Sequence, residues 1–316
     1  MNSDMIRVQN LIKYYAGVRA VDGVSFSVGR GELFGLLGPN GAGKTTTIRT
    51  MMDIIKPDSG TITLMGQPVT EASKARVGYL PEERGLYKNY GLLECLTYLA
   101  TLKGLSRADA RQRAMAFLGR VGLADYARRK VRELSKGMTQ KAQFLAAIVH
   151  DPDLLILDEP FQGLDPVNTD LLKTMLLEEQ ARGKTIILST HNMNQVEEMC
   201  NRILLMDHGR VVLYGPLDEI KARHAEHAVL LQCDTLPQTL PGVQRVEAHN
   251  QAQLLVLEPD TSPQEVLRRL VEAGVSIQRF EVATPPLEEI FISVVEGQSA
   301  PAGEVPVAGG PEVRKR

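Results

Sequence analysis

The chain contains the stretch Gly38-Pro39-Asn40-Gly41-Ala42-Gly43-Lys44-Thr45, which Thr46 and Thr47 follow. An apolar run at 33–37 precedes it and helix-compatible residues 46–52 follow it, so the pattern predicts a strand, a glycine loop and a helix. Glycines let backbone N–H groups curl around a polyphosphate, and the positive end of the new helix points at the same anion. In such a loop Lys44 reaches the β- and γ-phosphates, and the Thr45 hydroxyl binds Mg²⁺. We therefore expect this loop to bind a nucleotide.

A second group of candidate residues follows the apolar run 154–157, which predicts a strand buried on both faces of a parallel sheet. Asp158 and Glu159 end this strand, and two carboxylates are costly to bury without a cation or a polar site. Open α/β sheets bind ligands at the carboxyl ends of their strands. We therefore expect Asp158 to hold Mg²⁺ and Glu159 to orient and polarise an attacking water. The apolar run 185–188 leads in the same way to His191, which we interpret as a γ-phosphate sensor.

Two adjacent tyrosines, Tyr14 and Tyr15, precede the glycine loop. An aromatic face ahead of a phosphate loop is well suited to stack on an adenine ring. We choose Tyr15 for this role and keep Tyr14 in reserve. The structural alternative is a strand end with one ring packed inward.

Ser135 and Gly137 stand where an apolar helix over 142–149 is about to begin. Ser135 is an ordinary candidate for the N-cap of that helix. The same helix N-terminus is also a second anion site, whose meaning depends on the motifs that follow it.

The composition limits the classes of partner. At 316 residues the chain has room for about two domains. A formal net charge of −2 supplies no global field for nucleic acid, and we expect no nucleic-acid partner. The three cysteines are widely spaced, which argues against a disulfide framework and fits the cytoplasm. The sequence predicts neither a signal peptide nor a membrane span.

Together these motifs resemble the nucleotide-binding subunit of an ATP-binding-cassette (ABC) transporter over about residues 6–215. The segment 38–45 resembles the Walker A motif, 154–159 resembles Walker B, 134–138 occupies the signature position and 163–166 resembles the D-loop, which contains Asp165. The resemblance implies that ATP and Mg²⁺ are bound and that two such subunits, identical or different, pair head to tail. Ser135 and the Gly137 N–H would then contact the γ-phosphate held by the other subunit.

The chain departs from the family pattern at three positions. Lys136 stands where the signature usually has glycine, and Met138 where it usually has glutamine. Glu82 replaces the usual glutamine of the Q-loop; a carboxylate can still ligate Mg²⁺ but cannot donate an amide N–H. The run 78–87 around Glu82 resembles an exporter-like subgroup similar to bacterial sodium- or drug-efflux ATPases.

The expected fold class is α/β: a P-loop NTPase with a RecA-like core sheet, an antiparallel β subdomain, a helical insertion and a small C-terminal α/β accessory domain. We predict the ATPase domain at 1–222, with its helical subdomain at about 88–150, and the accessory domain at 225–297. Within the latter, Ser262 followed by Pro263 predicts a helix start. Residues 298–316 lack periodicity, and we expect them to be disordered.

The resemblance implies an ATPase subunit that powers a separate membrane permease, in the direction of export, from the cytoplasmic face of the inner membrane. The second hypothesis is a soluble ABC ATPase that acts on ribosomes or DNA, which usually carries two cassettes or long heptad coiled coils. Another P-loop enzyme, such as a kinase or GTPase, leaves Ser135, Asp165 and His191 without a joint explanation.

Overall fold

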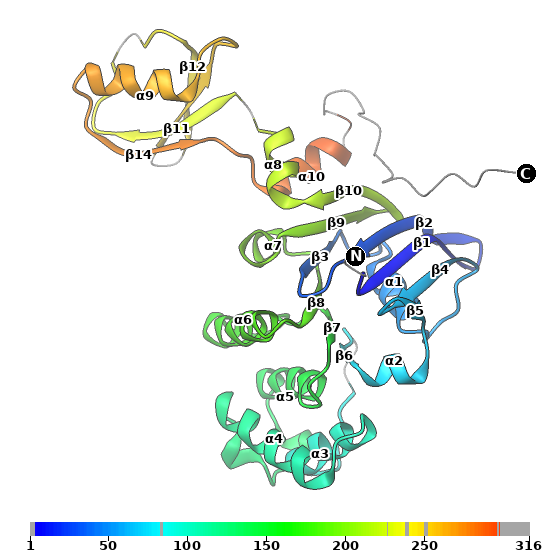
Figure 1. Ribbon diagram of the computed structural model, residues 1–316. Helices are drawn as coiled ribbons and strands as arrows, with labels where there is room; N and C mark the ends of the chain where they lie inside the picture. Colours follow the sequence, from blue (N-terminus) through cyan, green and yellow to red (C-terminus); the bar gives the residue numbers. More distant parts are fainter. Residues whose placement is uncertain are drawn as a thin grey trace, which may run out of the picture.

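The computed structural model describes residues 4–82, 85–225, 227–237, 240–249, 252–295 and 297. The tail predicted at 298–316 lies outside this part of the chain. Three sheets organise the described residues: a central mixed sheet, an antiparallel sheet beside it and a second antiparallel sheet near the C-terminus (Figure 1).

The central sheet has the strand order β10-β9-β3-β8-β7-β6. Its parallel part joins β9 (Arg202–Asp207), β3 (Leu33–Leu37), β8 (Thr185–Thr190), β7 (Leu154–Asp158) and β6 (Val77–Leu80). β10 (Arg210–Pro216) adds to β9 as an antiparallel edge strand. Every residue of β3, β7 and β8 is buried, as their unbroken apolar runs predict. Because parallel strands end at the same edge, the segments after β3, β7 and β8 become neighbours.

The antiparallel sheet has the order β2-β1-β4-β5 and consists of β2 (Val18–Val28), β1 (Ile6–Tyr15), β4 (Ser59–Leu64) and β5 (Gln67–Pro68). It shares one apolar core with helix α1 (Lys44–Met51) and with one face of β3. Phe26 stacks on Phe34 in this core, with ring centroids 5.7 Å apart. The predicted antiparallel β subdomain is confirmed.

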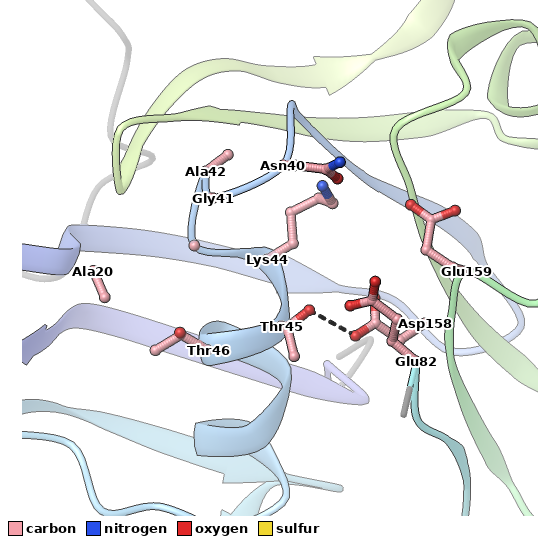
Figure 2. Close-up of a pocket in the computed structure, with 11 residues that line it drawn as sticks. Ala20, Asn40, Gly41, Ala42, Lys44, Thr45, Thr46, Glu82, Asp158 and Glu159 are labelled. Atoms are coloured by element: carbon pink, nitrogen blue, oxygen red, sulfur yellow. Dashed lines mark hydrogen bonds between the residues drawn. The ribbon is translucent and has the colours of Figure 1, made fainter. Parts of the chain in front are cut away.

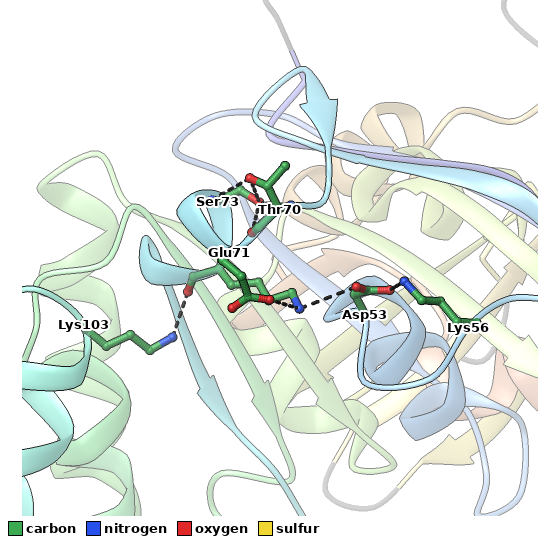
Figure 3. Close-up of polar contacts among 7 residues, drawn as sticks. Asp53, Lys56, Thr70, Glu71, Ser73 and Lys103 are labelled. Atoms are coloured by element: carbon green, nitrogen blue, oxygen red, sulfur yellow. Dashed lines mark hydrogen bonds and ion pairs between the residues drawn. The ribbon is translucent and has the colours of Figure 1, made fainter.

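Polar contacts join the segment that follows α1 to helix α2, and α2 to Lys103 of the helical region (Figure 3). Thr70 caps α2 (Glu71–Ala75), and the Lys74 ammonium pairs with Glu71 at 2.8 Å and with Asp53 at 3.5 Å. The Lys103 ammonium donates to the carbonyl oxygen of Lys74 at 2.8 Å. These contacts hold α2 between the two subdomains.

The helical insertion consists of α3 (Leu92–Leu102), α4 (Arg107–Arg120) and α5 (Lys136–Ile148), with 3₁₀ turns η1 (Ala124–Tyr126) and η2 (Val131–Glu133) before α5. These helices share an apolar core with the second face of the central sheet, which α6 (Pro166–Ala181) and α7 (Met193–Met199) also cover. The insertion was predicted from its helical spacing of apolar residues, and the structure confirms it. In Figure 1 it lies at the end of the molecule away from the C-terminal sheet.

The C-terminal sheet has the order β12-β13-β11-β14 and comprises β12 (Val243–His249), β13 (Ala252–Leu257), β11 (Ala228–Cys233) and β14 (Ile277–Val282). Helix α9 (Pro263–Glu272) covers one face and begins at the predicted Ser262 cap, with Glu265 completing a capping box. Strand β12 was not predicted. The sheet and α9 have a core of their own, separate from the other two.

The last helix, α10 (Leu287–Val295), packs away from this small core. Leu287 and Ile290 are buried in the same cluster as Leu217 and Ile220 of α8 (Leu217–Arg223). The Leu287 N–H donates to the carboxylate of Glu197 on α7. The chain therefore leaves the part that contains the central sheet, forms the C-terminal sheet and returns, and Figure 1 shows α10 beside α8. The domain boundaries predicted above remain a proposal.

Candidate nucleotide site

The glycine loop has a backbone that only glycine can adopt at two positions. Gly38 has a φ of 145° and Gly43 a φ of 102°. A Cβ on Gly38 would lie 2.2 Å from the carbonyl oxygen of Met206, and one on Gly43 would lie 2.4 Å from that of Ala20. The loop therefore packs closely between strand β9 and the start of strand β2. This packing fixes the arrangement of its N–H groups.

This loop borders a cavity of about 220 Å³ (Figure 2). The cavity combines loop residues, the start of α1 and acidic residues from two other segments. Its lining residues are Ala20, Asn40, Gly41, Ala42, Gly43, Lys44, Thr45, Thr46, Glu82, Asp158 and Glu159. Most of the residues predicted for one nucleotide thus surround one cavity.

The Lys44 side chain is held along the loop. Its ammonium donates to the carbonyl oxygens of Gly38 at 2.6 Å and Pro39 at 3.1 Å. Burial lowers the pKa of Lys44 below its ordinary value, and the carboxylates of Glu159 and Asp158 oppose this effect. Because this cation is held along the loop and lines the cavity, it is suited to bind a polyanion there.

Asp158 joins the start of α1 to the end of β8. Its two carboxylate oxygens accept hydrogen bonds from the Thr45 hydroxyl at 2.8 Å and from the Ser189 hydroxyl at 2.6 Å. Burial raises the pKa of Asp158 above its ordinary value, although both hydrogen bonds lower it. A carboxylate, a hydroxyl and the exposed carboxylate of Glu82 are hard oxygen donors, so these residues fit Mg²⁺.

Glu159 has a left-handed backbone, with a φ of 50°. This conformation costs a non-glycine residue roughly 1–3 kcal/mol and persists only when neighbouring contacts hold it. The Glu159 N–H donates to the Ser189 carbonyl oxygen at 2.9 Å, and its carboxylate accepts from the Thr190 hydroxyl at 3.0 Å. The ring Nδ1 of His191 lies 2.6 Å from the same carboxylate. The end of β8 thus aims the carboxylate at the cavity edge.

Seven predicted residues are not among those that line this cavity. Gly38 and Pro39 belong to the glycine loop itself, and His191 lies against Glu159. The other four are Tyr15, Ser135, Gly137 and Asp165. Tyr15 is 46% exposed at the end of β1, where Lys13 lies over its ring at 5.7 Å. Ser135 caps α5 by accepting from the Met138 N–H at 3.2 Å, and Gly137 lies in the first turn of that helix. Asp165 caps α6 by accepting from the Asn168 N–H at 2.9 Å. The adenine role of Tyr15 and the anion role of Ser135 remain predictions.

Sequence reasoning missed Ala20 in the lining and the hydroxyls of Ser189 and Thr190 as carboxylate partners. The two hydroxyls end an apolar strand that was predicted correctly. Their position on β8, which pairs with β7 in parallel, could have indicated a contact with Asp158 and Glu159.

Comparison with known proteins identifies the family. Residues 21–162 match the ABC transporter family model, and residues 215–295 match that of the ATP-binding protein DrrA1-3-like, C-terminal domain. Over 295 residues the chain is 39% identical to an uncharacterized ABC transporter ATP-binding protein of Bacillus subtilis (strain 168), and the match covers 92% of this chain and 98% of that protein. The chain belongs to the ABC transporter ATP-binding proteins. It is an ATPase subunit of a transporter, as the motifs predicted.

Two further comparisons agree with this assignment of the ABC ATPase. A Nod factor export ATP-binding protein I of Paraburkholderia xenovorans (strain LB400) is 41% identical over 213 residues, which cover 66% of this chain and 70% of that protein. A solved structure of an ATP-binding subunit of an ABC transporter is 34% identical to this chain, with a TM-score of 0.66. The match covers 70% of this chain and 93% of the chain in that structure. The predicted P-loop fold class is confirmed. In the described ranges, no helix of this ABC ATPase is both long and apolar enough to cross a bilayer.

Proposed function

We propose that this subunit binds ATP with Mg²⁺ at the glycine loop, hydrolyses it between two head-to-tail subunits and drives export through a separate membrane permease. One observation carries the proposal: the glycine loop, Asp158 and Glu159 converge on a single cavity. The convergence supports a site in which an amide-rich loop, a cation and two carboxylates serve one triphosphate.

The chemistry follows from the residues. Lys44 would give up its loop carbonyls for the β- and γ-phosphates, and the loop N–H groups would bind the remaining oxygens. Thr45, Asp158 and Glu82 would hold Mg²⁺, which when bound neutralises charge on the phosphate oxygens. Glu159 would accept a hydrogen bond from the attacking water and orient it toward the γ-phosphate. His191, held against Glu159, would contact the same phosphate.

A second subunit is needed to complete this arrangement. Ser135 and Asp165 are exposed and are not among the residues that line the cavity of their own chain. At the N-terminus of α5, Ser135 and the Gly137 N–H suit contact with the γ-phosphate held by a partner subunit, and Asp165 stands at the N-terminus of α6. Purification from membranes shows whether that partner is a second copy of this chain or a different cassette.

The proposed permease contact lies at residues 85–89 and on the helical insertion. Tyr87 and Tyr98 lie edge to face, 5.7 Å apart, and both are about half exposed. With Tyr90, Arg107 and Arg111 they line a cavity of about 670 Å³ in the helical region. Exposed aromatic and arginine side chains are typical of the centres of protein interfaces. Export is proposed because a relative's name describes Nod factor export, and the site would be at the cytoplasmic face of the inner membrane.

Nucleotide binding is tested first with Lys44→Ala. We expect a loss of ATP affinity of at least about tenfold by calorimetry, because a buried cation opposite the triphosphate is removed. The exposed Lys56→Ala serves as a control on a lysine outside the cavity. Unchanged ATP affinity in Lys44→Ala would reject the assignment of the loop.

The partner is tested by purification from detergent-solubilised membranes. Recovery of a polytopic membrane protein supports the permease, and its loss in a Tyr87→Ala/Tyr98→Ala double variant supports the proposed surface. Recovery of ribosomes or DNA would instead support the soluble ABC ATPase. The same preparation shows whether the second cassette is this chain or another.

A further inference from the structure

Gln140 connects the signature helix to the segment that follows Glu159. It lies on α5, five residues after Ser135, and is 1% exposed. Its Nε2 donates to the carbonyl oxygen of Pro160 at 2.5 Å. Proline has no backbone N–H, so this carbonyl is the only backbone hydrogen-bonding group that Pro160 offers.

The same face of α5 makes further contacts with this segment. The Cε atom of Lys136 lies 3.0 Å from the position that a Cβ on Gly163 would occupy. The lysine side chain therefore extends over that glycine. A Cβ on Gly137 would lie 3.9 Å from the Leu164 side chain. Lys136 and Gln140 are four residues apart and therefore share one face of the helix. The first turns of α5 and residues 160–164 thus form one packed unit.

Glu159 depends on contacts on both of its sides. Its φ of 50° places it in a conformation that neighbouring contacts must maintain. On one side the end of β8 binds its N–H and its carboxylate. On the other side the carbonyl oxygen of Pro160, the next residue, is held by Gln140. Movement of α5 relative to β8 would therefore change the direction of the Glu159 carboxylate.

We propose that Gln140 is a positioning residue for Glu159, which transmits the position of the signature turn to the carboxylate of the same subunit. The inference rests on the proposed function, in which Ser135 contacts the ATP of the partner subunit and Glu159 orients the water at its own ATP. A rigid helix begins at the first contact and carries Gln140 just over one turn later. Occupation of one ATP site thereby adjusts the carboxylate of the other.

The first test removes the hydrogen bond and keeps the volume of the side chain. In the full chain, Gln140→Met is expected to lower kcat for ATP at least about tenfold, because small misplacements of a catalytic group are costly. The Kd for ATP should stay within about twofold, since Gln140 is not among the residues that line the nucleotide cavity. Gln143→Met is the matched control: Gln143 is also buried on α5, and in the described part its Oε1 accepts no hydrogen bond.

The second test reverses the hydrogen bond. In Gln140→Glu a carboxylate would face the carbonyl oxygen of Pro160, whereas the protonated acid could donate to it. Burial raises the pKa of such a carboxyl, so kcat relative to the wild type should rise as pH falls from about 8 to about 6. A residue that only fills space would not produce this pH dependence, and Gln140→Glu therefore gives an answer even if Gln140→Met fails to fold.

The outcomes of these tests separate the possibilities. Loss of kcat in Gln140→Met and recovery of Gln140→Glu at low pH, with Gln143→Met normal, support the proposal. Wild-type kcat in Gln140→Met, an equal loss in Gln143→Met, or a flat pH ratio for Gln140→Glu would overturn it. Wild-type turnover in Glu159→Gln would instead overturn the proposed function, so the two failures are distinguishable.

Discussion

The Nδ1 atom of His191 lies 2.6 Å from Oε1 of Glu159, and the backbone N–H of His191 donates to the same oxygen at 2.9 Å. One carboxylate oxygen is therefore held twice by residue 191, while the other accepts from Thr190. The His191 side chain is still half exposed, although it is not among the residues that line the cavity. The two residues proposed for chemistry are thus one hydrogen-bonded unit.

Replacement of Glu159 by glutamine should remove turnover and preserve binding. The amide keeps the shape of the side chain but is a poor acceptor for the proton of the attacking water. We expect kcat to fall by about 10²–10⁴-fold, the usual contribution of a general base. Steady-state ATPase assays measure kcat, and calorimetry measures ATP affinity. Turnover equal to the wild type would rule out the water-orienting role.

His191→Ala should lower kcat less than a change at Glu159. The carboxylate would lose the ring contact but keep the backbone N–H of residue 191 and the Thr190 hydroxyl. We expect a loss of about 10–100-fold, since the general base remains and is only less well oriented. The exposed His208→Ala, whose ring contacts Asp207, is the control. If both histidine variants turned over ATP alike, the contact would be structural.

Asp158→Asn should separate stability from metal binding. Burial raises the pKa of Asp158, so the folded state binds the carboxyl proton more tightly than the unfolded state does. The folded protein therefore loses stability as pH rises through the folded-state pKa of Asp158. At neutral pH the nucleotide-free variant should therefore unfold at a higher temperature. Its affinity for Mg²⁺ in the presence of ATP should fall at least about tenfold. Calorimetric scanning and Mg²⁺ titration check both; unchanged Mg²⁺ affinity would refute the metal role.

His150 should make stability depend on pH. Burial lowers its pKa from 6.5 to about 4, helped by the nearby Lys103 cation. The unfolded chain binds a proton at His150 more readily than the folded chain does. The free energy of unfolding is therefore at its full value above about pH 6.5, and by the time the pH has fallen through about 4 it has dropped by about 3 kcal/mol. Urea unfolding at a series of pH values measures it. His150→Gln should flatten this part of the profile, and an unchanged slope would contradict the assignment.

The contact of α10 with the ATPase part should be energetically important. Leu287 is fully buried in the shared core, so Leu287→Ala should cost about 2–5 kcal/mol of unfolding free energy. Ile292, which is 46% exposed on the same helix, is the control, and Ile292→Ala should cost less than about 0.5 kcal/mol. Denaturant unfolding compares the two. Equal small effects would mean that α10 contributes little to the folded state.

The sequence alone determined the elements whose signals are local. The glycine loop, the apolar strands at 33–37, 154–157 and 185–188, and the Ser262 cap each depend on residues within a few positions of one another. Because the apolar strands end in polar residues, the sequence was enough to predict that Thr45, Asp158 and Glu159 lie at one edge of the sheet. Strand β12 was missed because its alternation is weak and it stands at a sheet edge.

Tertiary structure alone decided the contacts between segments far apart in the chain. The return of α10 to α7, the hydrogen bond from Gln140 to Pro160 and the position of Tyr15 outside the cavity lining have no local pattern. Periodicity tells which face of a helix is apolar, but not which of several apolar surfaces will cover it. That choice is made by chain connectivity and by the fit of whole surfaces, which are properties of the folded molecule.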